Sequence, residues 1–279
     1  MNKLNPERQV QIIKVLCEGN SIRSTARITG TAINTVVKLL TDVGLACLEY
    51  QDKVMRDLNL GRIQCDEIWS FVYAKQKNVP KDKQGEFGYG DVWTWTAIDA
   101  ETKLVPSWLV GLRDAPCAAA FIDDLAARLA NRVQLTTDGH KCYLEAVENA
   151  FGGQIDYAML VKLYGAENPG EARYSSAECS GTKRQVINGK PDEALISTSY
   201  VERQNLTMRM SMRRFTRLTN GFSKKIENHI SAVALYFMHY NFARPHSSLA
   251  NPYPRTPAMA AGIADHVWGV DEIIGLLSK

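Results

Sequence analysis

The sequence predicts a mixed α/β domain preceded by a smaller, all-α N-terminal domain. Residues 1–50 carry apolar side chains at helical spacing between short turns, whereas residues 62–165 alternate β-rich apolar runs with helical segments. The 279 residues are enough for both units, and a hydrophobic content of 45% is typical of folded proteins. We expect the α/β domain to cover residues 60–250 and a C-terminal tail to cover residues 251–279.

Three helices are predicted in residues 1–50. The first begins near Pro6 and ends at Gly19, the second covers residues 22–28, and the third follows the turn Thr29-Gly30-Thr31. Two helices joined by a short turn with Gly form the helix-turn-helix pattern. Polar residues that suit bases and phosphates lie off the apolar face of the third helix: Thr31, Asn34, Thr35 and Lys38. The residues alone leave DNA binding and a plain three-helix domain equally open.

The α/β region predicts a mixed sheet with helices on its faces. Its first three strands are predicted by runs rich in Val, Ile, Trp and Tyr, namely RIQCDEIWSFVYA, DVWTWTAIDA and KLVPSWLVG. A helix, a strand, a helix and a fifth strand follow, at residues 114–131, 132–139, 140–153 and 155–165. Residues 166–197 hold Gly, Pro and Ser, and we expect a loop or small insertion there.

A basic helix and a final helix complete the predicted order. The basic segment, TSYVERQNLTMRMSMRRFTRLTNGFSKK, begins at Thr198, and the final helix covers residues 228–238. At 100° per residue, Glu202, Asn205, Arg209 and Arg213 share one stripe of the basic helix. An adjacent apolar stripe, which we expect to dock on the sheet, consists of Val201, Met208, Met212 and Phe215. The cations predicted to follow a phosphate backbone are Arg203, Arg209, Arg213, Arg214 and Arg217.

Three acids occupy positions that suit a catalytic site. Asp66 lies within the first strand between hydrophobic neighbours, Asp138 ends the fourth strand, and Glu202 begins the basic helix. Taken singly, each has a structural interpretation: a buried acceptor, a turn residue before Gly139, and a charge that suits the helix dipole. Together they form a set of hard oxygen ligands suited to Mg²⁺ or Mn²⁺.

Other polar residues are expected to have lesser roles. Glu67 adjoins Asp66 but points to the opposite face of the sheet, so we expect a structural role for it. Asp99 is predicted to be a turn residue at the end of the second strand. His140 and His246 are candidates for positioning water or phosphate. The segment that holds Asn241, Arg244, Pro245 and His246 reveals no chemical role from sequence.

Composition and charge favour an intracellular protein without a membrane span. The longest apolar run, near residues 230–238, is too short for a bilayer, and MNKLNPERQV lacks a signal-peptide pattern. The six cysteines contain no C-x-x-C pair, which predicts neither a zinc site nor a disulfide framework and favours a reducing cytoplasm. The net charge is only +3, but cations concentrate in residues 203–225.

Several motifs of the chain resemble those of a known family. They are SIRSTARITGTAINTVVKLL, CDEIWSFV, TTDGHKCY, the basic segment that begins at Thr198, and HYNFARPHSSL. With them the chain resembles DDE transposases of bacterial and archaeal insertion sequences, in particular the insertion sequence 1 family. The resemblance implies a ribonuclease-H-like catalytic domain, a helix-turn-helix domain that binds DNA, and Asp66, Asp138 and Glu202 as catalytic metal ligands. It also implies an Arg seven residues after the Glu, matched by Arg209.

The expected function is therefore a Mg²⁺- or Mn²⁺-dependent DNA transposase. It would cut the ends of an insertion sequence and join the 3′-hydroxyl to target DNA, as a dimer or larger assembly on double-stranded DNA near the nucleoid. Some relatives carry an N-terminal Cys-rich zinc motif that is absent here, so end recognition would fall to the helix-turn-helix alone. Two alternatives remain open at this stage: a nuclease of the same fold, and a non-catalytic DNA-binding repressor whose acids are structural.

Overall fold

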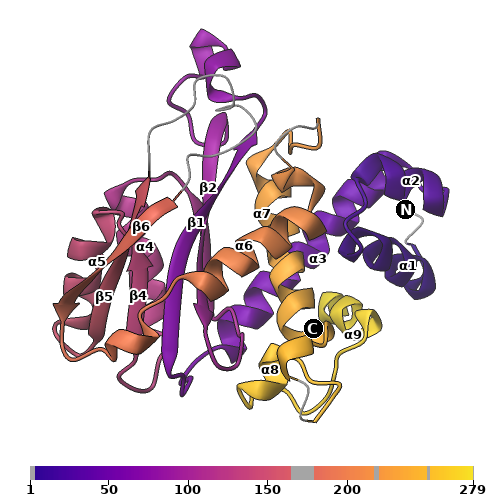
Figure 1. Cartoon of the computed structure of the whole chain (residues 1–279). Coiled ribbons are helices and arrows are strands. Elements are labelled where there is room, and N and C mark those ends of the chain that lie inside the picture. Colours follow the sequence, from indigo (N-terminus) through magenta and orange to yellow (C-terminus); the bar gives the residue numbers. More distant parts are fainter. Residues whose placement is uncertain (1–3, 165–178, 217–219, 250–251, 279) are drawn as a thin grey trace.

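The N-terminal region consists of three helices, in agreement with the sequence prediction. The computed structural model describes residues 4–164, 179–216, 220–249 and 252–278 (Figure 1). Its first helices are α1 (Pro6–Cys17), α2 (Ile22–Thr29) and α3 (Ile33–Val54). The side chain of Asn5 caps α1, that of Ser21 caps α2, and Gly30 ends α2 in the left-handed conformation with φ 59°. The third helix continues past residue 50, so it does not end where the predicted N-terminal unit ends.

The second half of α3 packs closely against α7 (Ile226–Met238). A Cβ atom built on Gly44 would lie 2.5 Å from Ser231, so only glycine permits this approach of the two helices. Farther along α3, Gln51 donates from Nε2 to the carbonyl of Ala234 at 3.3 Å. One hydrophobic cluster of buried residues runs from Ile12 on α1 to Phe237 on α7 and on into the sheet. The N-terminal helices and the sheet therefore share a continuous core.

The described residues form a mixed sheet of six strands in the order β3-β2-β1-β4-β5-β6. The strands are β1 (Arg62–Val72), β2 (Gly90–Asp99), β3 (Ser107–Gly111), β4 (Gln134–Asp138), β5 (Asp156–Tyr164) and β6 (Cys179–Asn188). Strands β3, β2 and β1 pair antiparallel, β1, β4 and β5 pair parallel, and β6 pairs antiparallel with β5. Parallel pairing places the carboxyl ends of β4 and β5 at the same edge of the sheet.

The segment 166–197, expected to be a loop or small insertion, contains the edge strand β6, so it is not a loop throughout. Almost every residue of β6 is exposed, because the strand lies at the edge of the sheet. Its sequence, CSGTKRQVIN, therefore lacks the regular apolar alternation that marks a half-buried strand. The strand is stabilised by its backbone pairing with β5, which the local sequence does not predict. Residues 165–178 lie outside the described part of the chain.

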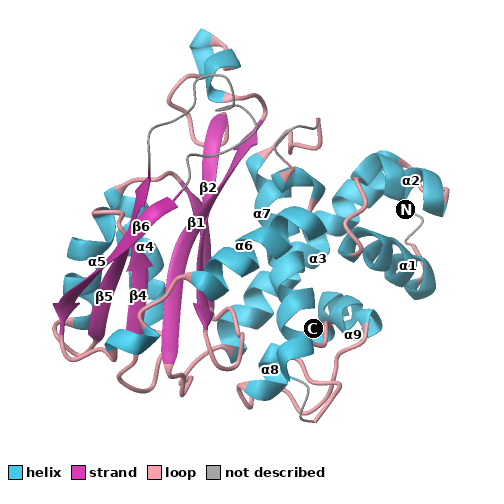
Figure 2. Ribbon diagram, in the orientation of Figure 1, coloured by secondary structure: helices cyan, strands magenta, loops and turns pink. Residues whose placement is uncertain are grey.

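Helices cover both faces of the sheet (Figures 1 and 2). On one face lie α4 (Ala115–Ala126) and α5 (Cys142–Phe151), where the ring of Trp95 packs 5.9 Å from Phe121 and 5.4 Å from Tyr143, centroid to centroid. On the other face lie α7 and α6 (Ser199–Ser211), which contacts β1 and β2. The site described below lies beside α6, at the point where the pairing of β1 with β4 ends.

The C-terminal residues 252–278 pack on the N-terminal helices and belong to the core. They form α8 (Pro257–Ala260) and α9 (Val270–Gly275). Ala258 and Ile273 are fully buried, and the ring of Trp268 lies 5.0 Å from that of Tyr50 on α3. In the described residues no single helix is long and apolar enough to cross a membrane, although α2 and α3, bent by 113°, meet that length and composition together.

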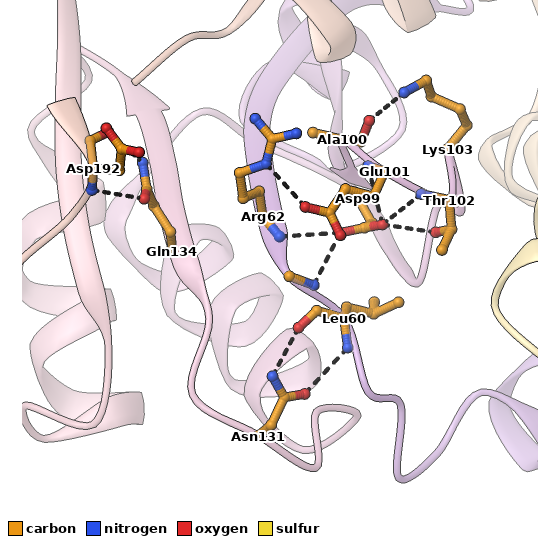
Figure 3. A network of polar contacts seen from close by, with 11 residues as sticks. Leu60, Arg62, Asp99, Ala100, Glu101, Thr102, Lys103, Asn131, Gln134 and Asp192 are labelled. Carbon is orange, nitrogen blue, oxygen red and sulfur yellow. Dashed lines mark hydrogen bonds and ion pairs between the residues drawn. The ribbon is translucent and has the colours of Figure 1, made fainter. Parts of the chain in front are cut away.

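A polar network holds the beginnings of β1 and β4 in place (Figure 3). Asp99, at the end of β2, is fully buried and accepts from the backbone N–H of Arg62 at 3.1 Å and of Thr102 at 2.7 Å. This confirms its predicted role as a turn residue. The side chain of Asn131 exchanges hydrogen bonds with the backbone of Leu60 just before β1. These contacts fix the register in which Cys65 of β1 faces Thr137 of β4.

Candidate active site

Strand pairing brings Asp66 and Asp138 to the same level of the sheet. Each follows directly after the paired residues Cys65 and Thr137 of the parallel strands β1 and β4. Ligand atoms of Asp66, Glu67 and Asp138 lie within 4.8 Å of one another, which is close enough for one ion to contact all three. This is a set of hard oxygen donors, the type that Mg²⁺ and Mn²⁺ prefer. The two acids predicted from separate strands are therefore neighbours.

Glu67 does not stand apart from these acids, contrary to the sequence expectation. It does face the opposite side of the sheet from Asp66, since its cross-strand partner is Trp95, which packs on α4 and α5. However, the pairing of β1 with β4 ends at Cys65, so no strand backbone separates the two faces beside Glu67 on that side. Its carboxylate therefore comes within 4.8 Å of the ligand atoms of Asp66 and Asp138. The sequence does not predict this proximity of Glu67 to Asp138, because it depends on where the pairing of β1 with β4 ends.

The environment of Glu67 is buried and incompletely satisfied. Its side chain is 1% exposed, and its Oε2 accepts from Nε of Arg113 at 3.0 Å. Its Oε1 is buried without a well-aligned hydrogen bond. Arg113, in the loop between β3 and α4, also places a terminal nitrogen 3.5 Å from Oδ2 of Asp138. A buried carboxylate oxygen without a well-aligned hydrogen bond, next to two further acids, fits a site for a cation.

Burial and mutual repulsion perturb the acids of this cluster. Burial, and then the charge of Asp138, raises the pKa of Asp66 to about 6. The same two causes, in the same order, raise the pKa of Glu67 to about 7, while the nearby hydroxyl of Tyr143 acts to lower it. Both shifts mean that negative charge is unfavourable here without compensation. A bound divalent cation would provide that compensation.

Helix α6 is fixed against β1 by two polar contacts. Oε1 of Gln64 on β1 accepts from the backbone N–H groups of Tyr200 and Val201 at 2.8 and 3.2 Å, and so caps the start of α6. One turn into the helix, Asn205 donates from Nδ2 to Oδ2 of Asp66 at 2.9 Å. Val201 and Met208 are fully buried beneath the helix, as the predicted apolar stripe requires.

Glu202 lies at the rim of the site and is held by two partners. Its Oε2 lies 2.6 Å from Nζ of Lys162 on β5, and its Oε1 accepts a hydrogen bond from the hydroxyl of Thr198. Glu202 is not part of the group formed by Asp66, Glu67 and Asp138. Its charge nevertheless helps to raise the pKa of Asp66, and Asn205 on the same side of α6 contacts Asp66 directly. All three predicted acids are thus gathered around one end of the sheet.

The predicted cationic stripe does not continue to Arg213. Helix α6 ends at Ser211, because Met212 adopts an extended conformation and a 3₁₀ turn, Arg213–Phe215, follows. This bend buries Met212 and Phe215 in the core. Arg214 donates from Nε to the hydroxyl of Ser223 at 2.7 Å and therefore points inward.

The other predicted DNA contacts on this segment differ in exposure. Arg203 and Arg213 are exposed, and Arg209 is half-buried. Arg217 lies outside the described residues. The bend after α6 therefore takes Arg213 off the helical stripe that Glu202 and Arg209 share.

The two candidate histidines differ in their surroundings. The backbone N–H of His140 donates to Oδ1 of Asp138 at 2.9 Å, and burial followed by the charge of Arg113 lowers the pKa of its ring. His246 instead contacts the hydroxyl of Ser248 through Nδ1 at 2.9 Å. Asn241, in the same motif as His246, is fully buried and exchanges two 3.0 Å hydrogen bonds with the backbone of Val105, which gives this residue a structural role.

The start of α3 presents polar side chains to the surface. Asn34 and Lys38 are exposed, whereas Thr31 and Thr35 are half-buried. Lys38 pairs with Asp42 one turn along the helix at 2.5 Å. A shallow groove beside this end of α3 is lined by Arg23, Ala26, Arg27, Thr31, Ala32 and Ile33. Two arginines and exposed amide and ammonium groups are suited to a phosphate backbone and base edges.

Comparison with known proteins adds little to this description. No protein-family model and no curated protein matches the chain. Among solved structures, the piggyBac transposase synaptic complex with hairpin DNA is similar with a TM-score of 0.41 and 11% sequence identity, over 99% of this chain and 71% of that chain. Similarity at this level assigns the chain neither to a family nor to a function, which must be inferred from its own residues.

Proposed function

We propose that this chain is a DNA transposase that cleaves the ends of an insertion sequence and joins the 3′-hydroxyl to target DNA by metal-dependent phosphoryl transfer. One observation supports the proposal: ligand atoms of Asp66, Glu67 and Asp138, from two separate strands, lie within 4.8 Å of one another, and the charge of Glu202 on α6 also acts on Asp66. Acids placed only for fold stability have no reason to converge on Asp66, whose pKa the charges of Asp138 and Glu202 help to raise. A ribonuclease-H-like fold of the insertion sequence 1 type is part of this proposal.

Asp66, Asp138 and Glu202 would hold Mg²⁺ or Mn²⁺. The donor set is chemically suitable, because it consists of carboxylate oxygens. Asp66 and Asp138 lie in one group with Glu67, whose Oε1 is buried without a well-aligned hydrogen bond, whereas Glu202 lies outside this group and pairs with Lys162. When bound, such ions activate the attacking oxygen and stabilise the leaving oxygen of a phosphodiester. Asn205 would orient the carboxylate of Asp66. Gln64 would fix the start of α6, and with it the position of Glu202 relative to Asp66.

Double-stranded DNA is the proposed partner. The start of α3, with Thr31, Asn34, Thr35 and Lys38, would read the element ends as the second helix of a helix-turn-helix. Arg203, Arg209 and Arg213 would contact phosphates near the site, and two element ends would be brought together by a dimer or larger assembly. Arg214 is not proposed to contact phosphate, because its Nε donates a hydrogen bond to the hydroxyl of Ser223.

The test uses the purified chain and DNA that carries the sequences flanking its gene. The proposal expects strand cleavage with Mg²⁺ or Mn²⁺, none with EDTA, and covalent joining of the cut 3′ end to a supercoiled target. Cleavage without joining would identify a nuclease. Binding without metal-dependent cleavage would identify a repressor and would overturn the proposal.

A further inference from the structure

Two basic side chains contact the carboxylates of the proposed active site from opposite sides. Arg113 approaches from the loop after β3 and lies 3.0 Å from Oε2 of Glu67 and 3.5 Å from Oδ2 of Asp138. Lys162 approaches from β5 and lies 2.6 Å from Oε2 of Glu202. Neither residue lies in the basic segment that the sequence singles out. The sheet order places β1 and β4 between the elements that carry them.

Both cations remain accessible to a ligand in solution. The side chain of Arg113 is 42% exposed and that of Lys162 is 29% exposed, while their partners Asp138 and Glu202 are 31% and 39% exposed. The carboxylates of Asp138 and Glu202 are therefore partly exposed to solvent while they pair with Arg113 and Lys162, respectively. Glu67 differs from these two acids. Its side chain is only 1% exposed, and its Oε2 accepts a hydrogen bond from Nε of Arg113.

We propose that Arg113 and Lys162 form a DNA phosphate-binding pair that also neutralises the carboxylates until metal binds. Four carboxylates, those of Asp66, Glu67, Asp138 and Glu202, would repel a DNA strand without such cations. A divalent ion competes with Arg113 for Asp138 and with Lys162 for Glu202. An ion held by these oxygens would leave the guanidinium and the ammonium to bind phosphodiester oxygens of the DNA.

This inference rests on the proposed function but makes two predictions of opposite sign that need no catalysis. Removing either cation removes a competitor for the metal, so metal should bind more tightly. Removing either cation also removes a phosphate contact, so DNA should bind more weakly. A residue that only stabilises the fold would weaken both kinds of binding together.

The experiment compares the full chain with Arg113→Gln and Lys162→Gln. Free Mn²⁺ is measured by electron paramagnetic resonance during titration, and duplex DNA binding is measured over a series of salt concentrations with Mn²⁺ present. Each variant should bind Mn²⁺ up to about fivefold more tightly, the size expected for one partly exposed ion pair. Each should also flatten the slope of log K against log salt by about 0.9, the effect of one lost phosphate contact.

Two further variants serve as controls. Arg132→Gln removes a cation that pairs with Asp156 at 2.8 Å where β5 begins, away from the cluster, and should change neither quantity. Arg113→Lys keeps the charge and should restore most of the salt slope. Thermal unfolding of every variant checks that the fold is retained.

The inference is overturned if either variant of the pair keeps the wild-type salt slope or binds Mn²⁺ no more tightly than the wild type. Failure of the proposed function would look different, because it would be absence of metal-dependent cleavage by the wild type. That result leaves the Mn²⁺ and salt measurements readable.

Discussion

Asn205 on α6 donates a 2.9 Å hydrogen bond to Oδ2 of Asp66 on β1. The contact joins two segments that are remote in the sequence, and it fixes which way the Asp66 carboxylate faces. Its other oxygen accepts from the backbone N–H of Glu67 at 2.8 Å, so both oxygens of Asp66 have defined orientations. The same contact ties the position of Glu202, one turn earlier on α6, to the end of the sheet.

Asn205→Ala should lower the rate of DNA cleavage while the affinity for DNA stays close to that of the wild type. The reason is loss of a hydrogen bond to a carboxylate, worth about 1.5–3 kcal/mol, which leaves Asp66 poorly oriented. Kinetics under conditions that separate kcat from KM check this. Gln204→Ala is the matched control, since Gln204 lies on the same helix and donates to the hydroxyl of Tyr236 at 3.0 Å. It should reduce stability without slowing the folded protein, and equal rates for the two variants would contradict the role given to Asn205.

Amide substitution of the three predicted acids should separate catalysis from binding. Asp66→Asn, Asp138→Asn and Glu202→Gln should each lower cleavage and joining by more than about a hundredfold, because each removes a proposed metal ligand. DNA binding in EDTA, measured by gel shift, should survive. Glu101→Gln is the control, because this acid pairs with Arg62 at the beginning of β1 (Figure 3). Any of the three variants that retains near-normal cleavage removes its residue from the site.

Recognition of element ends is best tested by point substitution on α3. Deleting residues 1–50 would cut inside α3 and uncover the face of α7 on which it packs, so it would test stability instead. Asn34→Ala should reduce the preference for terminal DNA by about 1–3 kcal/mol, the size of one good base contact. Lys38→Ala should weaken binding to all duplexes alike. Competition binding with terminal and random DNA measures both, and Lys53→Ala, exposed at the far end of α3, should change neither. An unchanged preference in Asn34→Ala would assign α3 to packing alone.

The contact of α3 with α7 should depend on Gly44. In Gly44→Ala the new Cβ would lie 2.5 Å from Ser231, so the two helices must separate. Overpacking of this kind costs about 1–3 kcal/mol, which urea unfolding would measure. Gly275→Ala provides a control in a helix, because a Cβ there meets no atom within 4 Å. A wild-type midpoint for Gly44→Ala would show that α3 and α7 are not in contact in solution.

Buried His229 should make stability depend on pH. Its ring nitrogens lie 3.3 Å from the hydroxyls of Ser70 and Ser223, and burial, then the charge of Arg214, lowers its pKa to about 3. In the unfolded chain the pKa returns to the ordinary histidine value of 6.5, so the unfolded state binds more protons than the folded state between pH 3 and pH 6.5. The free energy of unfolding should therefore fall as the pH drops below about 6.5, by up to about 1.4 kcal/mol per pH unit.

The readout is the difference between the wild type and His229→Gln, because carboxylates titrate in part of the same range. The variant is less stable at pH 7 but should lose less stability between pH 6.5 and pH 4. Parallel profiles for the two proteins would mean that His229 is not held neutral in the core.

Local patterns in the sequence determined the type and order of most elements. Helical spacing predicted α1, α2 and the start of α3, β-rich runs predicted β1 to β5, and the apolar stripe of Val201, Met208, Met212 and Phe215 is buried. These features are readable because apolar periodicity reports which face of an element is buried, whatever lies against it. The sequence also singled out three acids: one within the first strand, one at the end of the fourth strand and one at the start of the basic helix.

Only the tertiary structure decided how the site is completed. The edge position of β6, the bend after Ser211, the inward turn of Arg214 and the meeting of Glu67, Arg113 and Lys162 with the acids have no local signature. Each depends on which strands pair, on where the pairing of β1 with β4 ends, and on which side chains from other elements contact the acids there. These are contacts between residues far apart in the chain. Their free energies depend on the burial and charge of each group, and these are defined only once the sheet has formed.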